Sequence, residues 1–549
     1  MRMVSLLIAS CGFAIAGGIA IAQPANDKCA TLAGLDLPNA SVASAKTYAA
    51  GTFSGPPQNF TGADLSSFYS KLPAFCRVTI DAKPSPDSDI RIEVWMPLDS
   101  WNGRLQGLGN GGFAGLIDHF ELGAAVAKGY AATATDTGHQ GSPIDSSWAP
   151  GHPEKLIDFG YRGIHVMTTL AKLVVQKFYG DAPTRSYFAG CSDGGREALM
   201  EAQRYPADYD GILAGAPANY WTALLSLGAE VTKALSATPG AFIPQAKIPA
   251  IAQAVNAQCD KQDGVADGIL NDPRQCKFDP STIQCKGSKD TEKCLTTAQI
   301  WTLKAIYGGV RNPHFPSKAI FPGYLPGGEE GGGAWGVWIT GPAPGKGLMA
   351  YFANGYFSDM VYEKKDWDVK SFRVDTDLQT ATTKTAKALN ATDPDLSAFR
   401  SRGGKLILYH GWNDPAIPAA NTVNYYNIVN HYQKVLGKTG QSNADSFVRL
   451  YMVPGMQHCS GGPGADVFGQ SATWPADAQR NARTALENWV EKGTAPGVII
   501  ATKTAGEKPG VIGDTVMTRP LCPYPQAAQY KGSGDPNRAE DFVCSAHKK

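Results

Sequence analysis

The sequence lacks a surplus of either charge and, beyond its first 30 residues, any long apolar run. Its 549 residues include 50 Lys and Arg against 49 Asp and Glu, which leaves a net charge of +1. Neutralising a phosphate backbone requires a basic surplus, so this balance argues against nucleic acid as the main partner. A membrane-spanning helix needs about 20 consecutive apolar residues. No such run follows residue 30, and we therefore expect no membrane span in the mature protein.

Internal repeats and a disordered composition are also absent. Apolar residues make up 43% of the chain and charged residues only 18%, a balance that supplies a hydrophobic core and excludes intrinsic disorder. The 61 glycines and 37 prolines are typical of a loop-rich enzyme. The length allows two to four domains, although α/β enzymes also run long as a single unit.

The first 22 residues have the pattern of a signal peptide. Arg2 provides a short basic start, residues 4–21 are apolar, and Ala20-Ile21-Ala22 forms a cleavage site. An alternative interpretation is a bacterial lipoprotein box at residues 8–11, which would place a lipid on Cys11. Both interpretations predict export, so we expect a secreted or periplasmic protein.

The mature chain has an even number of cysteines and no C-x-x-C pair. An even number in an oxidising compartment predicts five disulfides, and the absence of C-x-x-C argues against a zinc ribbon or a thioredoxin-like site. Without Cys11, the cysteines are Cys29, Cys76, Cys191, Cys259, Cys276, Cys285, Cys294, Cys459, Cys522 and Cys544.

Predicted strands and helices alternate in two separate parts of the chain. Residues 90–96, 105–108, 130–135, 187–189, 210–214, 406–409 and 448–453 read as strands. Helices are predicted around residues 164–178, 194–205, 424–432 and 478–489. This alternation predicts an α/β fold with a parallel-rich sheet covered by helices. Residues 220–400 read as irregular, rich in Gly, Pro and aromatic residues. We therefore predict a first part at 23–219, an inserted domain at 220–400 and a second part at 401–549.

Residues 190–194 form a G-x-S-x-G motif centred on Ser192. The pentapeptide alone is a weak signal, but here it stands between a predicted strand and a predicted helix, as a nucleophile elbow requires. The glycines permit the tight turn that exposes the serine, and the N-terminus of the following helix favours developing negative charge. We therefore predict that Ser192 is a nucleophile.

A serine nucleophile needs a base, and the base needs an acid that orients it. His458 follows the predicted strand at 448–453, and Asp414 follows the one at 406–409. The chain order Ser192, Asp414, His458 is that of the α/β-hydrolase class. His139, His152, His165 and His410 are the competing histidines; His165 lies within a predicted helix, and we expect His410 to support the Asp414 loop.

Two cysteines stand beside two of these residues. Cys191 directly precedes Ser192, and Cys459 directly follows His458. A bridge between them would tie the nucleophile to the base across 268 positions of chain. For the oxyanion, we expect the N–H of Asp193 and a second N–H from the glycine loop at residues 109–113. Gly112 is the first choice for this second donor, with Gly111 as the alternative.

Three stretches of the chain resemble the tannase and feruloyl esterase family, which also contains a mono(2-hydroxyethyl) terephthalate hydrolase. They are GCSDGGREALMEAQRYPADYDGILAGAPA at residues 190–218, HGWNDPAIP at 410–418 and PGMQHC at 454–459. The resemblance covers nearly the whole mature chain. It implies an α/β-hydrolase fold with an inserted lid and a triad of Ser192, His458 and Asp414. It also implies the pairs Cys191–Cys459, Cys29–Cys76, Cys259–Cys276, Cys285–Cys294 and Cys522–Cys544.

An acidic run in the inserted segment suggests a metal site. Three carboxylates within eight residues, with glycines that turn the backbone, suit a hard cation, although the spacing is not that of an EF-hand. A solvated acidic loop would have the same composition. The resemblance implies structural calcium bound by Asp260, Asp263 and Asp267 and by the carbonyl groups of Val265 and Ile269.

The expected partner is a small aromatic ester, and the expected activity is its hydrolysis by a feruloyl esterase or tannase type of enzyme. A terephthalate monoester is the alternative substrate, and a peptidase, a lipase or an inactive binding protein on the same scaffold are alternative functions. The fold alone does not decide among them, and nothing in the sequence predicts the oligomeric state. Arg373 is a candidate for a substrate carboxylate. Aromatic residues that could contact an acyl ring are Trp335, Trp338, Tyr351, Phe352, Tyr356, Phe357 and Trp367.

Overall fold

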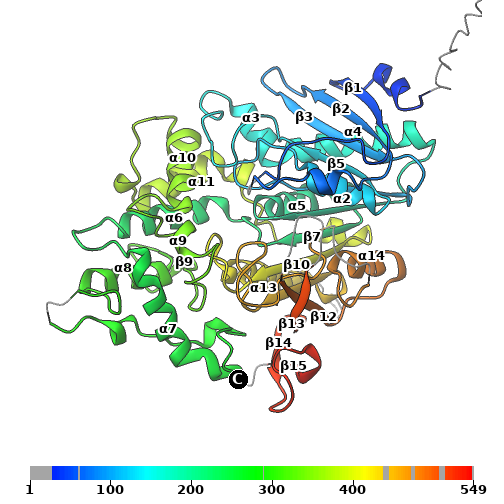
Figure 1. The fold of residues 1–549 in the computed structure, drawn as a ribbon. Helices are drawn as coiled ribbons and strands as arrows, with labels where there is room; N and C mark the ends of the chain where they lie inside the picture. Colours follow the sequence, from blue (N-terminus) through cyan, green and yellow to red (C-terminus); the bar gives the residue numbers. More distant parts are fainter. Residues whose placement is uncertain are drawn as a thin grey trace, which may run out of the picture.

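A computed structural model describes residues 27–59, 62–287, 290–436, 444–471, 477–505 and 513–546 (Figure 1). The predicted signal peptide at residues 1–22 and the alternative lipid site at Cys11 lie outside the described residues. Within the part of the chain that is described, no helix combines the length and the apolar character that crossing a membrane requires.

A nine-stranded mixed sheet forms the centre of the molecule, in the order β1-β2-β3-β5-β4-β6-β7-β10-β11. Strands β1 to β3 are antiparallel to their neighbours, and the pairs from β5 through β4, β6, β7 and β10 to β11 are parallel. The strands are β1 Ala40–Tyr48, β2 Phe75–Ala82, β3 Ile90–Pro97, β4 Arg104–Leu108, β5 Ala131–Thr135, β6 Arg185–Cys191, β7 Gly211–Gly215, β10 Lys405–Gly411 and β11 Val448–Val453.

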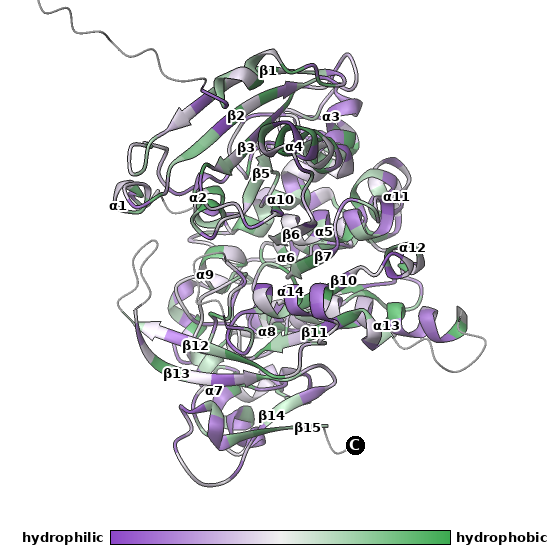
Figure 2. Cartoon of the chain, turned by 90° about the vertical axis from the view of Figure 1, so that its right-hand side faces the viewer, coloured by the Kyte–Doolittle hydropathy of each residue, from purple (hydrophilic) through white to green (hydrophobic). Residues whose placement is uncertain are grey.

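Helices cover both faces of this sheet because its inner strands are apolar on both sides (Figure 2). In β10, Leu406 and Leu408 pack into one cluster with α4, α5 and α13, whereas Ile407 and Tyr409 pack into another with α14. Helix α2 covers the same side as α14 farther along the sheet. The helices of this layer are α1 Ser66–Tyr69, α2 His119–Ala127, α3 Pro153–Ile157, α4 Gly163–Tyr179, α5 Asp193–Arg204, α13 Ala419–Leu436 and α14 Ala482–Lys492.

All seven predicted strands and four predicted helices are present, with ends shifted by up to five residues. The predicted α/β-hydrolase architecture is confirmed. The sequence analysis missed β1, β2 and a C-terminal pair of hairpins. These hairpins consist of β12 Ile499–Ala505, β13 Asp514–Leu521, β14 Gln526–Tyr530 and β15 Phe542–Ala546.

The segment between β7 and β10, here called the insert, adds no strand to the central sheet. The prediction that residues 220–400 are irregular was wrong, because this segment contains several helices. Helix α6, the first of them, is buried along most of its length. A separate hydrophobic cluster is formed mainly by the insert and also includes sheet-domain residues such as Phe113, Phe159 and Ile417. The domain limits at 220 and 400 remain a prediction. The insert comprises α6 Trp221–Ala234, α7 Ile248–Cys259, α8 Thr297–Gly308, β8 Val310–Arg311, β9 Ala319–Phe321, α9 Trp335–Trp338, α10 Leu348–Gly355, α11 Val374–Leu389 and α12 Ser397–Ser401.

Five disulfides cross-link the described part of the chain, and they are the five pairs that the resemblance implies. The sequence separation of the two bridged cysteines ranges from nine residues to 268. The pairs are Cys29–Cys76, Cys191–Cys459, Cys259–Cys276, Cys285–Cys294 and Cys522–Cys544.

Candidate active site

Ser192 lies at the sharp turn between β6 and α5. Its backbone has φ +68° and ψ −120°, a strained conformation for a residue with a side chain. The flanking glycines permit this turn. A Cβ at Gly190 would lie 2.5 Å from the carbonyl oxygen of Gly194, and a Cβ at Gly194 would lie 2.8 Å from that of Asn110. The local geometry is therefore that of a nucleophile elbow.

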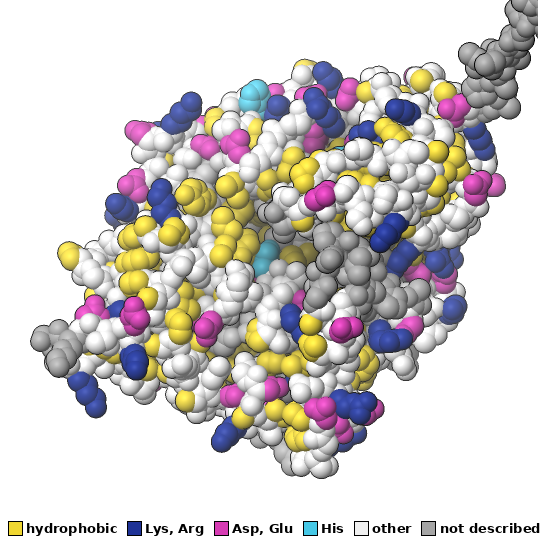
Figure 3. Space-filling view, viewed as in Figure 1, with side chains coloured by type: hydrophobic (Ala, Val, Ile, Leu, Met, Phe, Trp, Pro, Cys, Tyr) yellow, Lys and Arg dark blue, Asp and Glu magenta, His cyan; other side chains and the backbone are white. Residues whose placement is uncertain are grey.

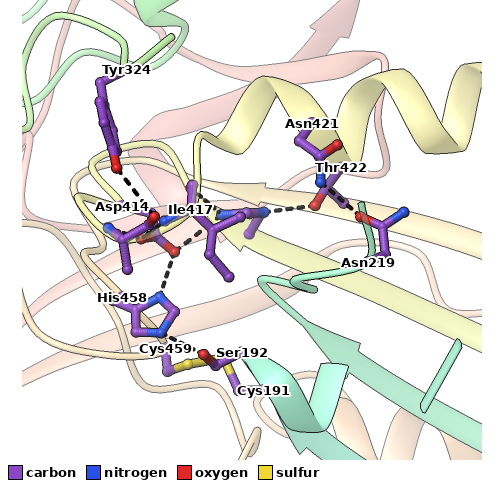
Figure 4. Close-up of polar contacts among 12 residues, drawn as sticks. Cys191, Ser192, Asn219, Tyr324, Asp414, Ile417, Asn421, Thr422, His458 and Cys459 are labelled. Carbon is purple, nitrogen blue, oxygen red and sulfur yellow. Dashed lines mark hydrogen bonds and ion pairs between the residues drawn. A yellow bond between two sulfur atoms is a disulfide. The ribbon is translucent and has the colours of Figure 1, made fainter. Parts of the chain in front are cut away.

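A chain of hydrogen bonds connects Ser192, His458 and Asp414 (Figure 4). The Nε2 atom of His458 lies 2.9 Å from Oγ of Ser192, and its Nδ1 atom lies 2.8 Å from Oδ2 of Asp414. The three residues follow the carboxyl ends of β6, β10 and β11, parallel strands in the same half of the sheet, with β7 between β6 and β10. The structure thus brings together the three residues that the sequence predicts. Their arrangement can activate a serine hydroxyl.

Asp414 is fully buried and is held ionised by its surroundings. Its Oδ1 atom accepts hydrogen bonds from the backbone N–H groups of Ala416 (2.8 Å) and Ile417 (2.9 Å). Burial opposes ionisation, but His458 and His410 outweigh it and keep the pKa of Asp414 below its ordinary value.

His410 supports the acid from a buried position. Its Nε2 atom faces two acceptors, Oδ2 of Asp414 at 3.1 Å and the carbonyl oxygen of Ile417 at 3.0 Å, so Nε2 carries the hydrogen. Its Nδ1 atom then accepts from the hydroxyl of Thr422 at 2.7 Å. His410 has the supporting position that we expected.

The other competing histidines lie away from Ser192. His139 bonds the carbonyl oxygen of Phe113, and burial lowers its pKa to about 4. His152 pairs with Asp87, and His165, which lies on α4, pairs with Asp208 and stacks on Tyr205.

The expected oxyanion donors remain a prediction, and the geometry does not distinguish Gly111 from Gly112 as the second donor. Both glycines and Asp193 line the pocket above Ser192. Among the described residues, none of their three backbone N–H groups donates to another protein group. Unpaired N–H groups that face a pocket are what an oxyanion hole requires.

A pocket of about 570 Å³ opens above Ser192 and His458. One wall is apolar and comes mainly from the insert; Figure 3 shows apolar side chains gathered over α9 and α10 on this face. The sheet domain lines the remainder with both polar residues and apolar ones such as Leu108, Leu116 and Ile144. The apolar wall includes Trp221, Leu224, Leu225, Trp338, Leu348, Met349, Phe352, Ala416 and Ile417, and the polar side includes Gln58, Asn59, Asp118, Glu121, Gln470, Ser471 and Arg483.

Two of the seven predicted aromatic residues, Trp338 and Phe352, line this pocket. The Trp338 ring lies edge-on to the His458 ring, with centroids 5.1 Å apart. The other five lie elsewhere: Trp335, Tyr356 and Phe357 are buried in the insert core, Trp367 packs beside it, and Tyr351 is exposed.

Arg373 does not line the pocket. Its side chain is 67% exposed and pairs with Asp375. The lining cation is Arg483 of α14, whose Nη2 atom lies 3.1 Å from Oε2 of Glu121. No sequence signal pointed to Arg483, because it lies in an ordinary-looking helix far along the chain.

The predicted calcium ligands lie on a loop that packs against the C-terminal hairpins. One oxygen of each carboxylate accepts a backbone N–H of the same loop: Asp263 from Val265, Asp260 from Gly268, and Asp267 from Ile269. The second oxygen of Asp267 accepts from Arg519 of β13 at 2.7 Å. Val265 packs against β14 and β15 beside the Cys522–Cys544 bridge.

This loop fits a hard cation in chemistry. Burial, with the charges of Asp267 and Asp260, raises the pKa of Asp263 to about 6, so negative charge accumulates here beyond what Arg519 balances. Oxygen donors with excess negative charge are what calcium selects. Within the described ranges, however, no three His, Cys, Asp or Glu side chains converge in an arrangement that could hold a metal. The calcium site therefore remains a prediction.

Comparisons with known proteins agree with this geometry. The family profile described as tannase and feruloyl esterase matches residues 76–545. An uncharacterized esterase of Xanthomonas campestris is 39% identical, with 99% of this chain and 96% of that protein covered. The mono(2-hydroxyethyl) terephthalate hydrolase of Piscinibacter sakaiensis is 34% identical, covering 86% of this chain and 85% of that protein.

A solved structure shows the same fold over almost the full length. Feruloyl esterase B from Aspergillus oryzae superposes with a TM-score of 0.83 at 28% identity, covering 94% of this chain and 99% of that chain. Together with the profile match, this similarity settles the family. The chain is an esterase of the tannase and feruloyl esterase family.

Proposed function

We propose that the protein hydrolyses esters of small aromatic acids through an acyl-enzyme formed on Ser192. The observation that carries the proposal is the unbroken chain of hydrogen bonds from Ser192 through His458 to Asp414, at the floor of a pocket with an apolar wall. An inactive binding protein would have no need for this hydrogen-bonded triad.

The geometry supports a two-step reaction. Ser192 Oγ attacks the ester carbonyl while His458 Nε2, 2.9 Å away, takes its proton. The N–H groups of Asp193 and of Gly112 or Gly111 stabilise the oxyanion. When the tetrahedral intermediate collapses, His458 gives the proton to the leaving alcohol. Water, deprotonated by His458, then attacks the acyl-enzyme and releases the acid, while Asp414 stabilises the imidazolium in both steps.

The apolar wall favours an aromatic acyl group without a free carboxylate. Trp338 and Phe352 stand with aliphatic side chains of α6 and α10, a surface suited to a planar ring. In the described part of the insert, no Lys or Arg lines the pocket, and Arg483 is paired with Glu121. A hydroxycinnamoyl or galloyl ester therefore fits this pocket better than a terephthalate monoester, whose acid group needs a cation.

The proposal also includes a bound calcium ion and export of the protein. Asp260, Asp263 and Asp267, with the carbonyl groups of Val265 and Ile269, would hold a calcium ion that supplies positive charge to the loop and takes no part in ester cleavage. The five disulfides support a location outside the reducing cytoplasm.

The test is a panel of methyl ferulate, methyl gallate, mono(2-hydroxyethyl) terephthalate and a short-chain aryl acetate with the purified protein. We expect turnover of the aryl acetate and a higher kcat/KM for a ferulate or gallate ester than for the terephthalate. Trp338→Ala should raise KM for the aromatic acyl esters about tenfold and leave the aryl acetate within about twofold. Absence of turnover on every ester would favour a binding protein, and a preference for the terephthalate would overturn the assignment of the acyl group.

A further inference from the structure

Helix α5 buries a row of carboxyl groups directly behind the nucleophile. Asp193, Glu197 and Glu201 are spaced four residues apart and therefore share one face of the helix. Their exposed fractions are 1%, 0% and 0%. Charged side chains are rarely buried unless they are paired or perform a task. The middle member, Glu197, has no part in the triad.

Glu197 holds the backbone of the glycine loop that carries the second oxyanion donor. Its Oε2 atom accepts the N–H of Asn110 at 2.8 Å, and a Cβ at Gly109 would lie 3.0 Å from the same oxygen. The carbonyl oxygen of Asn110 accepts the N–H of Gly194 at 2.8 Å. Both polar backbone groups of Asn110, next to Gly111 and Gly112, are thus fixed by α5.

The carboxyl group of Glu197 also interacts with that of Asp193, whose N–H is the first expected oxyanion donor. Oδ1 of Asp193 accepts from Nε of Arg196 at 2.6 Å. Oδ2 of Asp193 and Oε1 of Glu197 are buried, and neither accepts from an N–H or alcohol donor among the described residues. A hydrogen bond between two carboxyl groups requires one proton.

That proton belongs to Glu197. Arg196 is hydrogen-bonded to Asp193, which favours the ionised form of this carboxyl. Burial, and then the negative charge of Asp193, raise the pKa of Glu197 well above its ordinary value. A protonated Glu197 can therefore donate from Oε1 to Asp193 while it accepts from Asn110 through Oε2.

We propose that Glu197, in its protonated form, is a positioning residue that sets the separation between the two sides of the oxyanion hole. The inference rests on the proposed function, because it assigns an oxyanion hole to these N–H groups. A neutral carboxyl is suited to the task, since it offers one donor and one acceptor on the same rigid group. An ionised carboxylate would accept from Asn110 but repel Asp193.

Three variants test this role. Glu197→Gln keeps one donor and one acceptor without charge, and we expect its kcat to stay within about threefold of wild type. Glu197→Met keeps the size but loses both bonds. Its kcat should fall about 10- to 100-fold with KM within about threefold, somewhat less than the loss of an oxyanion donor itself. Glu201→Met is the matched control: it is as buried and on the same face, but no contact with the glycine loop is found, so kcat should stay within about twofold.

A second measurement separates positioning from a structural defect. The affinity for an aryl boronic acid, which forms a tetrahedral adduct with the serine, should fall in Glu197→Met by about the same factor as kcat/KM. The affinity for the product acid should stay the same. If Glu197→Met does not fold, Glu197→Asp replaces it, because an acid shortened by one methylene cannot reach both partners.

The proposal is overturned if Glu197→Met, or Glu197→Asp in its place, keeps its kcat, if Glu197→Gln loses as much as Glu197→Met, or if Glu201→Met loses as much as either. These comparisons are made with the aryl acetate as substrate. Failure of the proposed function would look different, because the wild type itself would then turn over no ester.

Discussion

The triad and the acidic loop at residues 260–269 are both built from charged residues, but they are held in different ways. Ser192, Asp414 and His458 follow the carboxyl ends of three parallel strands of the central sheet, and the Cys191–Cys459 bridge joins the nucleophile side to the base side. The acidic loop has only a short 3-10 helix. It depends on its own backbone N–H groups, on Arg519 and on packing against β14 and β15.

The difference shows what each kind of support can do. In the triad, every charge meets an opposite or polar partner, and the pKa of Asp414 lies below its ordinary value. In the loop, burial, and to a smaller extent the charges of Asp267 and Asp260, raise the pKa of Asp263 to about 6. The triad is therefore preorganised by the fold, whereas the loop has negative charge that an external cation would neutralise. Variants of the triad should consequently change the rate of hydrolysis, and variants of the loop should change the melting temperature.

The largest effect on hydrolysis is expected for Ser192→Ala. Without the nucleophile, kcat/KM should fall at least ~10³-fold, because the oxyanion hole and binding alone give only a residual rate. The melting temperature should stay within about 2 °C. Ser460→Ala, a serine that lines the same pocket, is the control and should keep its activity. Phosphonate labelling of another serine in an active Ser192→Ala protein would refute the assignment.

The second largest effect is expected when Cys191 and Cys459 are both replaced by Ala. The bridge places Ser192 against His458, so kcat should fall about 10- to 100-fold. The matched control is the double replacement of Cys285 and Cys294, whose bridge spans nine residues in an exposed part of the insert. This control should change kcat less than twofold. Steady-state kinetics of both double variants decide the matter, and equal activity would show that the strands suffice to place the triad.

A smaller effect is expected for His410→Ala. The change removes a hydrogen bond to Asp414 and leaves Asp414 with less support, so kcat should fall about 10-fold while KM is unchanged. Thr422→Val, one contact farther away, should cost threefold at most. A loss in Thr422→Val as large as in His410→Ala would place the effect in the packing around α13.

The smallest effect on kcat, within about twofold, is expected when calcium is removed with a chelator. The melting temperature should instead fall by about 3–8 °C, since a bound ion stabilises only the folded state. Asp263→Ala combined with Asp267→Ala should reproduce this shift, whereas the exposed Asp366→Ala in the insert should not. If the purified protein contains no calcium and the chelator leaves the melting temperature unchanged, the segment is an acidic loop without a metal site.

The sequence predicted the triad because each member follows a local signal. Ser192 stands in a strand–turn–helix motif, and Asp414 and His458 each come directly after an apolar strand, so local patterns were sufficient. The residues of the pocket wall were harder to predict. Trp221 and Leu224 lie in α6, within a segment rich in Gly and Pro that reads as irregular, and the side of the helix that faces the pocket depends on tertiary packing.

The roles of Glu197 and Arg519 could not be predicted from the sequence, for a different reason. In GGREALMEA, an acid at helical spacing reads as a solvent-facing residue, because a burial that depends on distant chain neighbours leaves no trace in the local pattern. Arg519 lies 252 positions from Asp267. Contacts of this kind are set by tertiary packing, and only the folded chain brings them together.

The Cys191–Cys459 bridge also has a topological consequence. It closes a covalent ring that contains Asp414 and the whole insert, and Ser192 and His458 lie just inside the closure. One proteolytic cut anywhere between residues 191 and 459 opens the ring without separating the molecule into two pieces. A nicked enzyme would therefore migrate as one species on a non-reducing gel and as two after reduction, with nucleophile and base joined until the bridge itself is broken.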